Sequence, residues 1–391
     1  MEEYRDNNRD SGVNSKSDSA FFERHSRLRK FLKIMLILGI VVLCLNHASF
    51  LRYRSILRKG EQPEAYDVIS LELIIEGGGR LAWSPDPDII FYDKIDEEAG
   101  LLRDHHVYNI YKYNFSSDSS SKVIPTDDSS APPGNKGQPA VSPNGEWLIF
   151  QGEYENHEAS RYWSDPGRGK HNNLWVMNLS SSEIFQLTDY DIDQGVLHPH
   201  FNPTGDKIVF SHLYSDKGWT GSWQIHVADF YIDEGVPKLD NITSLKPGAE
   251  EGEDTIFYET HDFSADGSKI LFTSDFKIGA MGLSEIYTYD LYTEELVQLT
   301  NSWECMDEHA NFSPDGEKIV WMSKMQQQWS PYKTDLFLMD KDGNNKTLLV
   351  KSPGGVIADN DWSPDGTKIA FTNLNNYQNT EHDIYLVTLK G

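Results

Sequence analysis

The 391-residue sequence contains only two cysteines, Cys44 and Cys305. Cys44 lies in an apolar run near the N-terminus, and Cys305 lies far from it in an acidic region. We therefore expect no disulfide between them, which excludes a disulfide framework as the source of stability. A chain of this length buries enough apolar surface to fold without one.

Positive charge is scarce beyond the first 59 residues. Residues 1–59 hold 12 Lys and Arg against 6 Asp and Glu, whereas residues 60–391 hold 23 against 55. A body with a net charge of −32 repels a phosphate backbone, so we exclude nucleic acid as a partner. The same acidity is compatible with a cationic or metal-ion partner, and equally with simple solubility.

Several catalytic motifs are missing as well. No G-x-S-x-G nucleophile elbow occurs. The glycine-rich stretch EGGGR at 76–80 stands between two expected strands with no helix after it, so it predicts a turn and not a phosphate-binding loop. No helical periodicity follows residue 51. The sequence thus carries no signature of a serine hydrolase or of a nucleotide-binding enzyme.

The N-terminal region predicts a tail and a membrane anchor. Residues 1–30 are polar and become basic toward their end, and the following segment, 31–51, contains an uncharged stretch at 34–51. That stretch has 18 residues, the short limit for a membrane span. We interpret 31–51 as a signal-anchor, with a cleaved signal peptide as the alternative, and 52–65 as a linker. The prediction is a single-pass membrane protein with the rest of the chain on the extracytoplasmic side.

One phrase, in contrast, recurs along the rest of the chain. It consists of an aromatic residue or valine, a polar turn in which proline and glycine fix the backbone, and an alternating apolar run. Each copy predicts a tight turn between two antiparallel strands. The six copies are WSPDPDIIF (83–91), VSPNGEWLIF (141–150), FNPTGDKIVF (201–210), FSADGSKILF (263–272), FSPDGEKIVW (312–321) and WSPDGTKIAF (362–371).

Further alternating segments follow each copy, most clearly at 174–188, 286–300 and 336–350. They add two strands to each repeat, which makes four strands per repeat and six repeats. This pattern predicts an all-β fold over 66–391, a monomeric six-bladed β-propeller of four-stranded antiparallel blades. The last copy ends after its third strand, and the segment 66–79 stands before the first copy. We expect 66–79 to complete the last blade and so to close the ring.

The repeated phrase, followed by segments such as IYTYDLYTEELVQLT (286–300), resembles the WD-like propeller repeat of TolB-type proteins. The resemblance covers about residues 66–391. The small N-terminal domain of TolB itself is not visible here. The same repeat is similar to the propellers of prolyl-oligopeptidase relatives and of oligogalacturonate lyases. TolB-like modules recognise extended segments of other proteins, whereas the lyases hold a metal ion through a cluster of His and Gln side chains.

Long connections join the second and third strands of the expected blades and share one face of the ring. Function concentrates in such loops on a rigid scaffold, and exposed aromatic residues mark binding surfaces. The alternative is that these loops only cover the blade edges. The candidate binding residues on this long-loop face are Tyr154, Arg161, Trp163, Trp219, Trp329 and Tyr332.

Polar residues also precede the repeated turns, in the strands expected to line the central channel. His198, His309 and Asp359 each lie four residues before the Ser or Asn of a turn, and His200 lies two residues before. Imidazole and carboxylate groups suit a divalent metal ion, and Gln194, His198, His200 and His309 loosely resemble the His and Gln metal cluster of oligogalacturonate lyases. The alternative is that each His hydrogen-bonds a neighbouring blade.

These observations predict a membrane-anchored, extracytoplasmic propeller that acts as a non-enzymatic scaffold. Its expected partner is another protein or a glycan, with the membrane contacted through 34–51, and no cofactor is required. The alternative is a metal-dependent carbohydrate-active enzyme similar to a polysaccharide lyase. In that case His198, His200, His309 and Asp359 would bind a divalent ion at the mouth of the channel.

Overall fold

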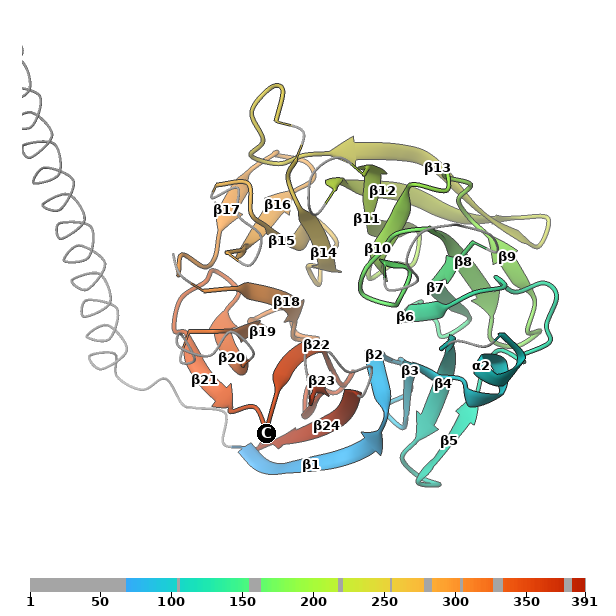
Figure 1. Ribbon diagram of the computed structural model, residues 1–391. Coiled ribbons are helices and arrows are strands. Elements are labelled where there is room, and N and C mark those ends of the chain that lie inside the picture. Colours follow the sequence, from blue (N-terminus) through green and yellow to red (C-terminus); the bar gives the residue numbers. More distant parts are fainter. Residues whose placement is uncertain are drawn as a thin grey trace, which may run out of the picture. The chain divides into compact units, whose positions relative to one another are not determined.

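A computed structural model describes residues 68–103, 106–154, 163–216, 221–253, 255–277, 283–302, 305–325, 333–375 and 382–390. Figure 1 shows six sheets arranged around a central axis, and each sheet has four antiparallel strands. The predicted all-β six-bladed propeller is confirmed. The predicted tail, signal-anchor and linker at 1–65 lie outside the described residues. Within those residues, no helix has both the length and the apolar character needed to cross a bilayer.

The blades follow one another along the chain, and in blades one to five the first strand is innermost. Blade one contains β2 (Gly78–Trp83), β3 (Ile89–Ile95), β4 (Tyr108–Asn114) and β5 (Ser119–Lys122). Blade two contains β6 (Lys136–Val141), β7 (Trp147–Glu153), β8 (Asn172–Asn178) and β9 (Ile184–Gln186). Blade three contains β10 (Gly195–Phe201), β11 (Lys207–Ser215), β12 (Ser222–Asp233) and β13 (Val236–Leu245).

The second half of the ring repeats the arrangement. Blade four contains β14 (Tyr258–Phe263), β15 (Lys269–Ser274), β16 (Glu285–Asp290) and β17 (Leu296–Gln298). Blade five contains β18 (Asp307–Phe312), β19 (Lys318–Ser323), β20 (Asp335–Asp340) and β21 (Thr347–Val350). Blade six contains β22 (Val356–Trp362), β23 (Lys368–Leu374), β24 (His382–Leu389) and, as its outermost strand, β1 (Val68–Glu76).

The ring closes between the two ends of the propeller, as the sequence predicts. Strand β1 pairs antiparallel with β24, and Leu71 stands opposite Val387 in the ladder. The outermost strand of blade six therefore comes from the start of the propeller and its other three strands from the end. This pairing keeps the first and last blades together through backbone hydrogen bonds.

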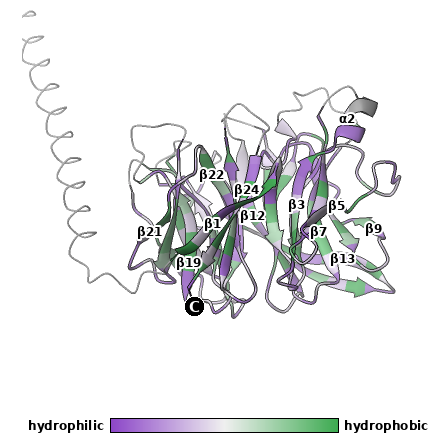
Figure 2. Cartoon of the chain, turned by 90° about the horizontal axis from the view of Figure 1, so that it is seen from below, coloured by the Kyte–Doolittle hydropathy of each residue, from purple (hydrophilic) through white to green (hydrophobic). Residues whose placement is uncertain are grey.

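The apolar core lies between the blades, in six clusters that each join two neighbours. Successive side chains of a strand point to opposite faces of the sheet. The second strand of each blade therefore contributes to two clusters, one on each side of the blade. In β19, Ile319 and Trp321 pack toward blade four, whereas Val320 and Met322 pack toward blade six. Figure 2 shows the hydrophobic residues concentrated on the strands. Both faces of a blade are thus buried.

One element was not predicted. A seven-residue helix, α2 (Glu97–Arg103), follows β3 in blade one, although the sequence after residue 51 shows no helical periodicity. The side chain of Asp96 explains where the helix begins, since Asp96 Oδ1 accepts a hydrogen bond of 3.2 Å from the backbone N–H of Ala99. Seven residues are too few to produce a visible periodicity.

Carboxylates near the channel connect the inner strands of successive blades. Asp262 accepts backbone N–H groups from Phe263 (2.7 Å) in its own blade and from Phe312 (3.1 Å) in blade five. Asp361 accepts in the same way from Trp362 (2.8 Å) and from Trp83 (2.6 Å) in blade one. The hydrogen bonds from Phe312 to Asp262 and from Trp83 to Asp361 each cross to the next blade. They fix the spacing between neighbouring inner strands.

Burial raises the pKa of both carboxyl groups. Burial and the nearby charge of Asp361 together raise the pKa of Asp262 to about 8. The pKa of Asp361 rises to about 7, although the N–H groups of Trp83 and Trp362 oppose the shift. The folded protein therefore holds these protons at a pH where the unfolded chain has released them.

We predict that Asp361→Ala lowers the free energy of unfolding by about 1–3 kcal/mol, because the N–H groups of Trp83 and Trp362 lose their acceptor. Chemical denaturation at pH 5 measures this. The control is Asp127→Ala, which removes an exposed carboxylate and should leave the free energy of unfolding unchanged. Equal stability of the two variants would contradict the inter-blade role.

The raised pKa values of Asp262 and Asp361 predict that the stability of the fold depends on pH. The unfolded pKa lies near 4, so the contribution of Asp361 to stability is full below that pH and is lost as the pH rises through about 7. Asn cannot ionise, so the stability of wild type relative to Asp361→Asn should fall between pH 5 and pH 9. Paired urea titrations at the two pH values check this, and a constant difference would show that the carboxyl is not buried as a neutral acid.

Candidate metal centre

Irregular backbone in the inner strands brings polar side chains to the channel. In β10 the pairing with β11 shifts between Leu197 and His200, and in β18 the pairing with β19 shifts between Glu308 and Asn311. His198 and His309 lie in these β-bulges with φ of 46° and 51°. A left-handed backbone is unusual for a residue with a Cβ atom. The bulge turns each of these side chains out of the regular alternation of the strand.

The β-bulge of blade four begins one residue closer to the following turn than the bulges of blades three and five do. Its bulge in β14 falls between Thr260 and Asp262, so that Thr260 stays paired and His261 is the extra residue. His261 therefore reaches the channel although it lies three, not four, residues before the turn serine, Ser264. This shift brings a third imidazole to the centre.

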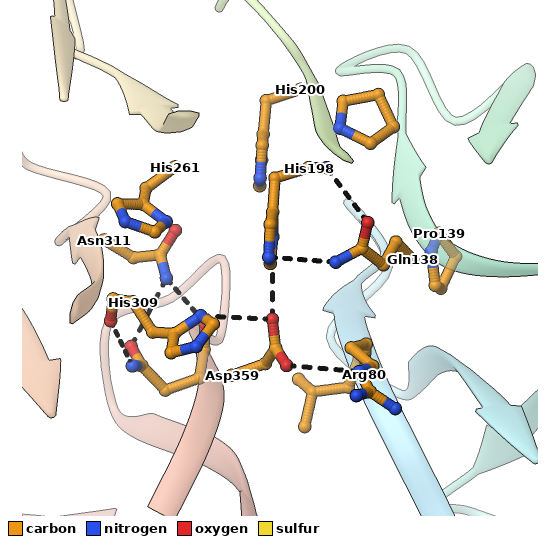
Figure 3. Close-up of a pocket in the computed structure, with 12 residues that line it drawn as sticks. Arg80, Gln138, Pro139, His198, His200, His261, His309, Asn311 and Asp359 are labelled. Atoms are coloured by element: carbon orange, nitrogen blue, oxygen red, sulfur yellow. Dashed lines mark hydrogen bonds and ion pairs between the residues drawn. The ribbon is translucent and has the colours of Figure 1, made fainter. Parts of the chain in front are cut away.

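Figure 3 shows the imidazoles of His198, His261 and His309 facing one another across the channel. Their ring centroids form a nearly equilateral triangle, with separations of 5.3 Å (His198–His309), 5.6 Å (His261–His309) and 5.7 Å (His198–His261). One nitrogen of each ring lies within 4.8 Å of the others. Three nitrogen donors thus converge from three different blades.

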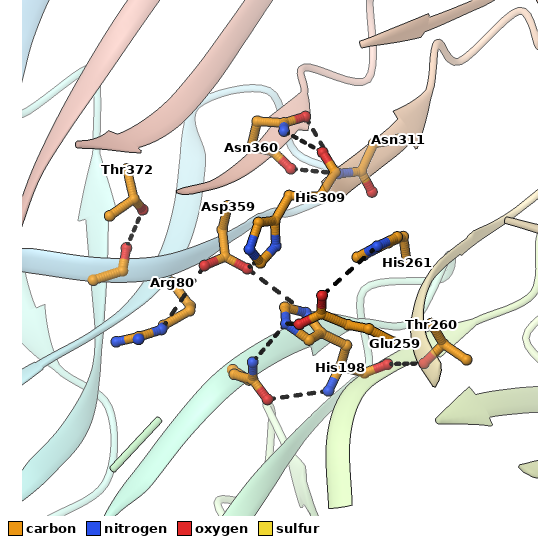
Figure 4. Close-up of polar contacts among 12 residues, drawn as sticks. Arg80, His198, Glu259, Thr260, His261, His309, Asn311, Asp359, Asn360 and Thr372 are labelled. Carbon is orange, nitrogen blue, oxygen red and sulfur yellow. Dashed lines mark hydrogen bonds and ion pairs between the residues drawn. The ribbon is translucent and has the colours of Figure 1, made fainter. Parts of the chain in front are cut away.

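Two carboxylates hold this triad of imidazoles. Glu259 Oε1 lies 2.9 Å from His198 Nε2, and its other oxygen lies 4.0 Å from His261 Nε2. Asp359 Oδ1 lies 3.6 Å from His198 Nδ1 and 3.5 Å from His309 Nδ1. Figure 4 shows both carboxylates between the rings, with Arg80 on the far side of Asp359 at 3.8 Å. Carboxylate partners of this kind fix the orientation of metal-binding imidazoles.

The electrostatics of the centre follow from burial and these close charges. Burial alone would raise the pKa of Glu259, but His309 and His198 outweigh it and lower that pKa to about 2. Burial alone would lower the pKa of His309, but Asp359 and Glu259 raise it to about 10. Burial lowers the pKa of His261 well below its usual value. At neutral pH the two carboxylates are ionised, and a proton on His309 supplies compensating positive charge.

The donor set fits a divalent metal ion. Imidazole nitrogens and carboxylate oxygens are ligands of borderline ions such as Zn²⁺ and Mn²⁺. His309 Nδ1 is buried and has Asp359 Oδ1 as an ion-pair partner at 3.5 Å, at the limit of a hydrogen bond. A cation at the centre would replace the proton on His309 as the counter-charge to Asp359 and Glu259.

A pocket of about 370 Å³ lies at the mouth of the channel, next to the imidazoles. Its lining includes the apolar side chains of Trp163, Trp223 and Phe257 and the basic groups Arg80, Arg168, Lys170 and Lys324. Glu308 also lines it and accepts a hydrogen bond of 2.7 Å from Ser284 Oγ. Burial and the charge of Glu259 raise the pKa of Glu308 to about 7. Such a group exchanges a proton readily near neutral pH.

The structure brings together three of the four predicted metal-binding residues, His198, His309 and Asp359. His200 lines the same part of the channel but is not one of the three converging imidazoles. Burial and the neighbouring His198 lower the pKa of His200 to about 3. The sequence analysis missed His261, Glu259 and Glu308.

The predicted binding residues are only partly placed. Trp163 lines the mouth pocket, and Lys170 Nζ lies 5.0 Å from the centre of its ring. Tyr154 instead donates a hydrogen bond from its hydroxyl to the backbone oxygen of Tyr190. The other four lie outside the described residues: Arg161, Trp219, Trp329 and Tyr332.

Comparisons with known proteins support the fold. No family model matches the chain. TolB from Acinetobacter baumannii superimposes with a TM-score of 0.50 at 20% identity, over 74% of this chain and 59% of that one. An oligogalacturonate lyase in complex with manganese gives a TM-score of 0.48 at 17% identity, over 80% and 76% of the two chains.

A sequence match extends to a peptidase from Porphyromonas gingivalis. Dipeptidyl-peptidase 5 is 27% identical over 136 residues, which is 34% of this chain and 19% of that protein. The chain thus spans about a fifth of that relative and 59% of the TolB chain. At these identities the similarity concerns architecture, and the six blades with their closure between β1 and β24 give this chain a TolB-like β-propeller fold.

Proposed function

We propose that the channel binds one divalent metal ion through His198, His261 and His309, and that the loaded site acts on an anionic carbohydrate in the mouth pocket. The observation that carries the proposal is the convergence of three imidazole nitrogens within 4.8 Å of one another. Catalytic zinc sites commonly have three protein ligands and one open position. The expected setting is the extracytoplasmic side of a membrane.

The surroundings of the imidazoles support a catalytic use. A bound divalent ion would supply a Lewis acid for an acidic group of the ligand. Arg80 and Arg168 line the pocket beside the centre and would orient an anionic substrate. Burial and the charge of Glu259 raise the pKa of Glu308 to about 7. Glu308 would therefore accept a proton from the carbon next to that acidic group. Perturbed carboxyl groups in a cleft are typical of active sites.

Proton removal next to an acidic group leads to cleavage by elimination. The C–H electron pair forms a new C=C bond while the bond to the glycosidic oxygen breaks, and the proton passes to Glu308. The leaving oxygen takes up a proton from solvent water, and Glu308 afterwards returns its own proton to solvent. The products are one chain end with a double bond and one with a free hydroxyl. This reaction is the one expected of a polysaccharide lyase.

The second candidate is a non-enzymatic scaffold for a protein segment or a glycan. It is favoured by the apolar part of the mouth pocket, where Trp163, Trp223 and Phe257 lie beside Met306 and Met322. Aromatic and Met side chains are enriched at the centre of binding interfaces. This function uses the pocket but requires no proton transfer at Glu308.

We predict that His261→Ala and His309→Ala each reduce the bound metal by one equivalent per chain relative to wild type, since each removes one converging imidazole. Elemental analysis after dialysis against Zn²⁺ or Mn²⁺ measures this. The matched control is His106→Ala, an exposed histidine. Unchanged metal content in both channel variants would contradict a metal ion at the centre.

We predict that Glu308→Gln abolishes cleavage while it leaves the metal content unchanged, because Gln cannot accept the proton. The assay follows the ultraviolet absorbance of the new double bond with a panel of uronate oligosaccharides. Trp163→Ala should raise KM more than it lowers kcat, since the indole only lines the pocket. If wild type forms no product but retains a glycan or peptide in equilibrium binding, the scaffold function is supported and the lyase function is not.

A further inference from the structure

A second group of histidines lies in blade three, away from the channel. His212 is on β11, and Gln224 and His226 are on β12. His212 stands opposite Gln224 in the ladder, and His226 is two residues farther along β12, so the three side chains share one face of the blade. Tyr190, from the connection between blades two and three, stacks on His212 with 4.0 Å between ring centroids.

The polar atoms of this group are spaced like the ligands of one metal ion. His212 Nδ1 and His226 Nε2 are 3.3 Å apart, and the Gln224 side-chain amide lies 3.2 Å from the first and 2.9 Å from the second. Tetrahedral zinc with bonds of about 2.0–2.1 Å places its ligands roughly 3.3–3.4 Å apart. A half-turn of the Gln224 amide presents Oε1, a ligand atom, where Nε2 lies.

Hydrogen bonding alone accounts poorly for the contacts of His226 Nε2. Three polar atoms surround it: His212 Nδ1 at 3.3 Å, Gln224 Nε2 at 2.9 Å and Ser244 Oγ at 3.0 Å. A ring nitrogen carries either one proton or one lone pair, so it makes one good hydrogen bond. The two ring centroids are only 4.5 Å apart, so the rings meet obliquely and not along a straight N–H···N line.

The far nitrogens of both rings have partners of their own. Gln194 Oε1 lies 3.3 Å from His212 Nε2, and Tyr190 Oη lies 2.9 Å from His226 Nδ1. An amide oxygen only accepts, so His212 Nε2 carries the proton and His212 Nδ1 keeps its lone pair. Such outer partners set the tautomer and the orientation of metal-binding imidazoles.

Solvent reaches one edge of this blade-three group. Both imidazoles are buried, with 5% of each residue exposed, whereas Ser244 at its edge is exposed. An ion can therefore enter past Ser244 and then lie among buried donors. Two neutral imidazoles and oxygen ligands bind Cu²⁺ and Zn²⁺ more tightly than Mn²⁺.

We propose that His212, His226 and Gln224 form a second transition-metal site, for Zn²⁺ or Cu²⁺, with Ser244 or water as the fourth ligand. The site would join β11, β12 and β13 of blade three. It does not rest on the proposed function, because its residues differ from those of the channel and contribute nothing to the mouth pocket.

Calorimetric titration of the full chain with Zn²⁺ tests this site. The background is His261→Ala/His309→Ala, in which the channel donors are removed, and we expect one equivalent of Zn²⁺ to bind there. Adding His226→Ala should weaken this binding at least a hundredfold. Adding Gln224→Glu should tighten it about tenfold or more, since a carboxylate replaces a neutral amide.

His106→Ala, at an exposed histidine outside the site, is the matched control and should leave the affinity unchanged. Tyr190→Phe removes an outer hydroxyl but no ligand, so it should weaken the binding by less than His226→Ala does. Gln224→Glu guards against loss of folding, since it predicts a gain and not a loss. Absence of Zn²⁺ binding in the background variant, or binding that His226→Ala and Gln224→Glu leave unchanged, would overturn the proposal. If wild type binds one equivalent that only His226→Ala removes, the blade-three site stands and the channel site fails.

Discussion

The antiparallel ladder between β1 and β24 is the interaction on which the rest of the molecule depends. A propeller packs its blades around one axis, and the ring is complete only when the first and last blades are joined. Here the joint is backbone pairing within blade six, reinforced by the apolar cluster that packs Ile384 and Leu386 against blade one. Without this pairing blade six would have three strands. Ile75, which packs in the same cluster as Ile384, would also be lost from the contact with blade one.

The channel site is a direct consequence of that closure. His198, His261 and His309 come from blades three, four and five, and Asp359 comes from blade six. No two of them are neighbours in the sequence, so only the circular arrangement brings them together. The bonds from Asp262 and Asp361 to the next blade hold the inner strands beside this site at a fixed spacing. A small change of that spacing would alter every distance between the imidazoles.

The sequence predicted the fold more completely than the site, for a physical reason. Each repeated turn is a local structure: in blade six, Ser363 Oγ accepts the N–H of Lys368 at 2.9 Å and Gly366 has a φ of 70°. Local signals of this kind can be read from a few residues, and six copies determine the number of blades. The position of a bulge depends on pairing with the adjacent strand. His261 was missed because blade four places its bulge one residue later than blades three and five.

The bulges alone do not indicate function. Blade two has the same irregularity at Gln138, with a φ of 51°, and blade one has a register shift before Leu81. The architecture therefore supplies an inward-pointing position in blade after blade. The side chains at these positions differ around the ring and are in contact with one another: Arg80 lies 3.8 Å from Asp359, and Gln138 Nε2 lies 2.9 Å from His198 Nε2. The same architectural position thus holds an arginine in blade one, a glutamine in blade two and histidines in blades three to five. The fold supplies the positions, and the residue types placed there decide the chemistry of the channel.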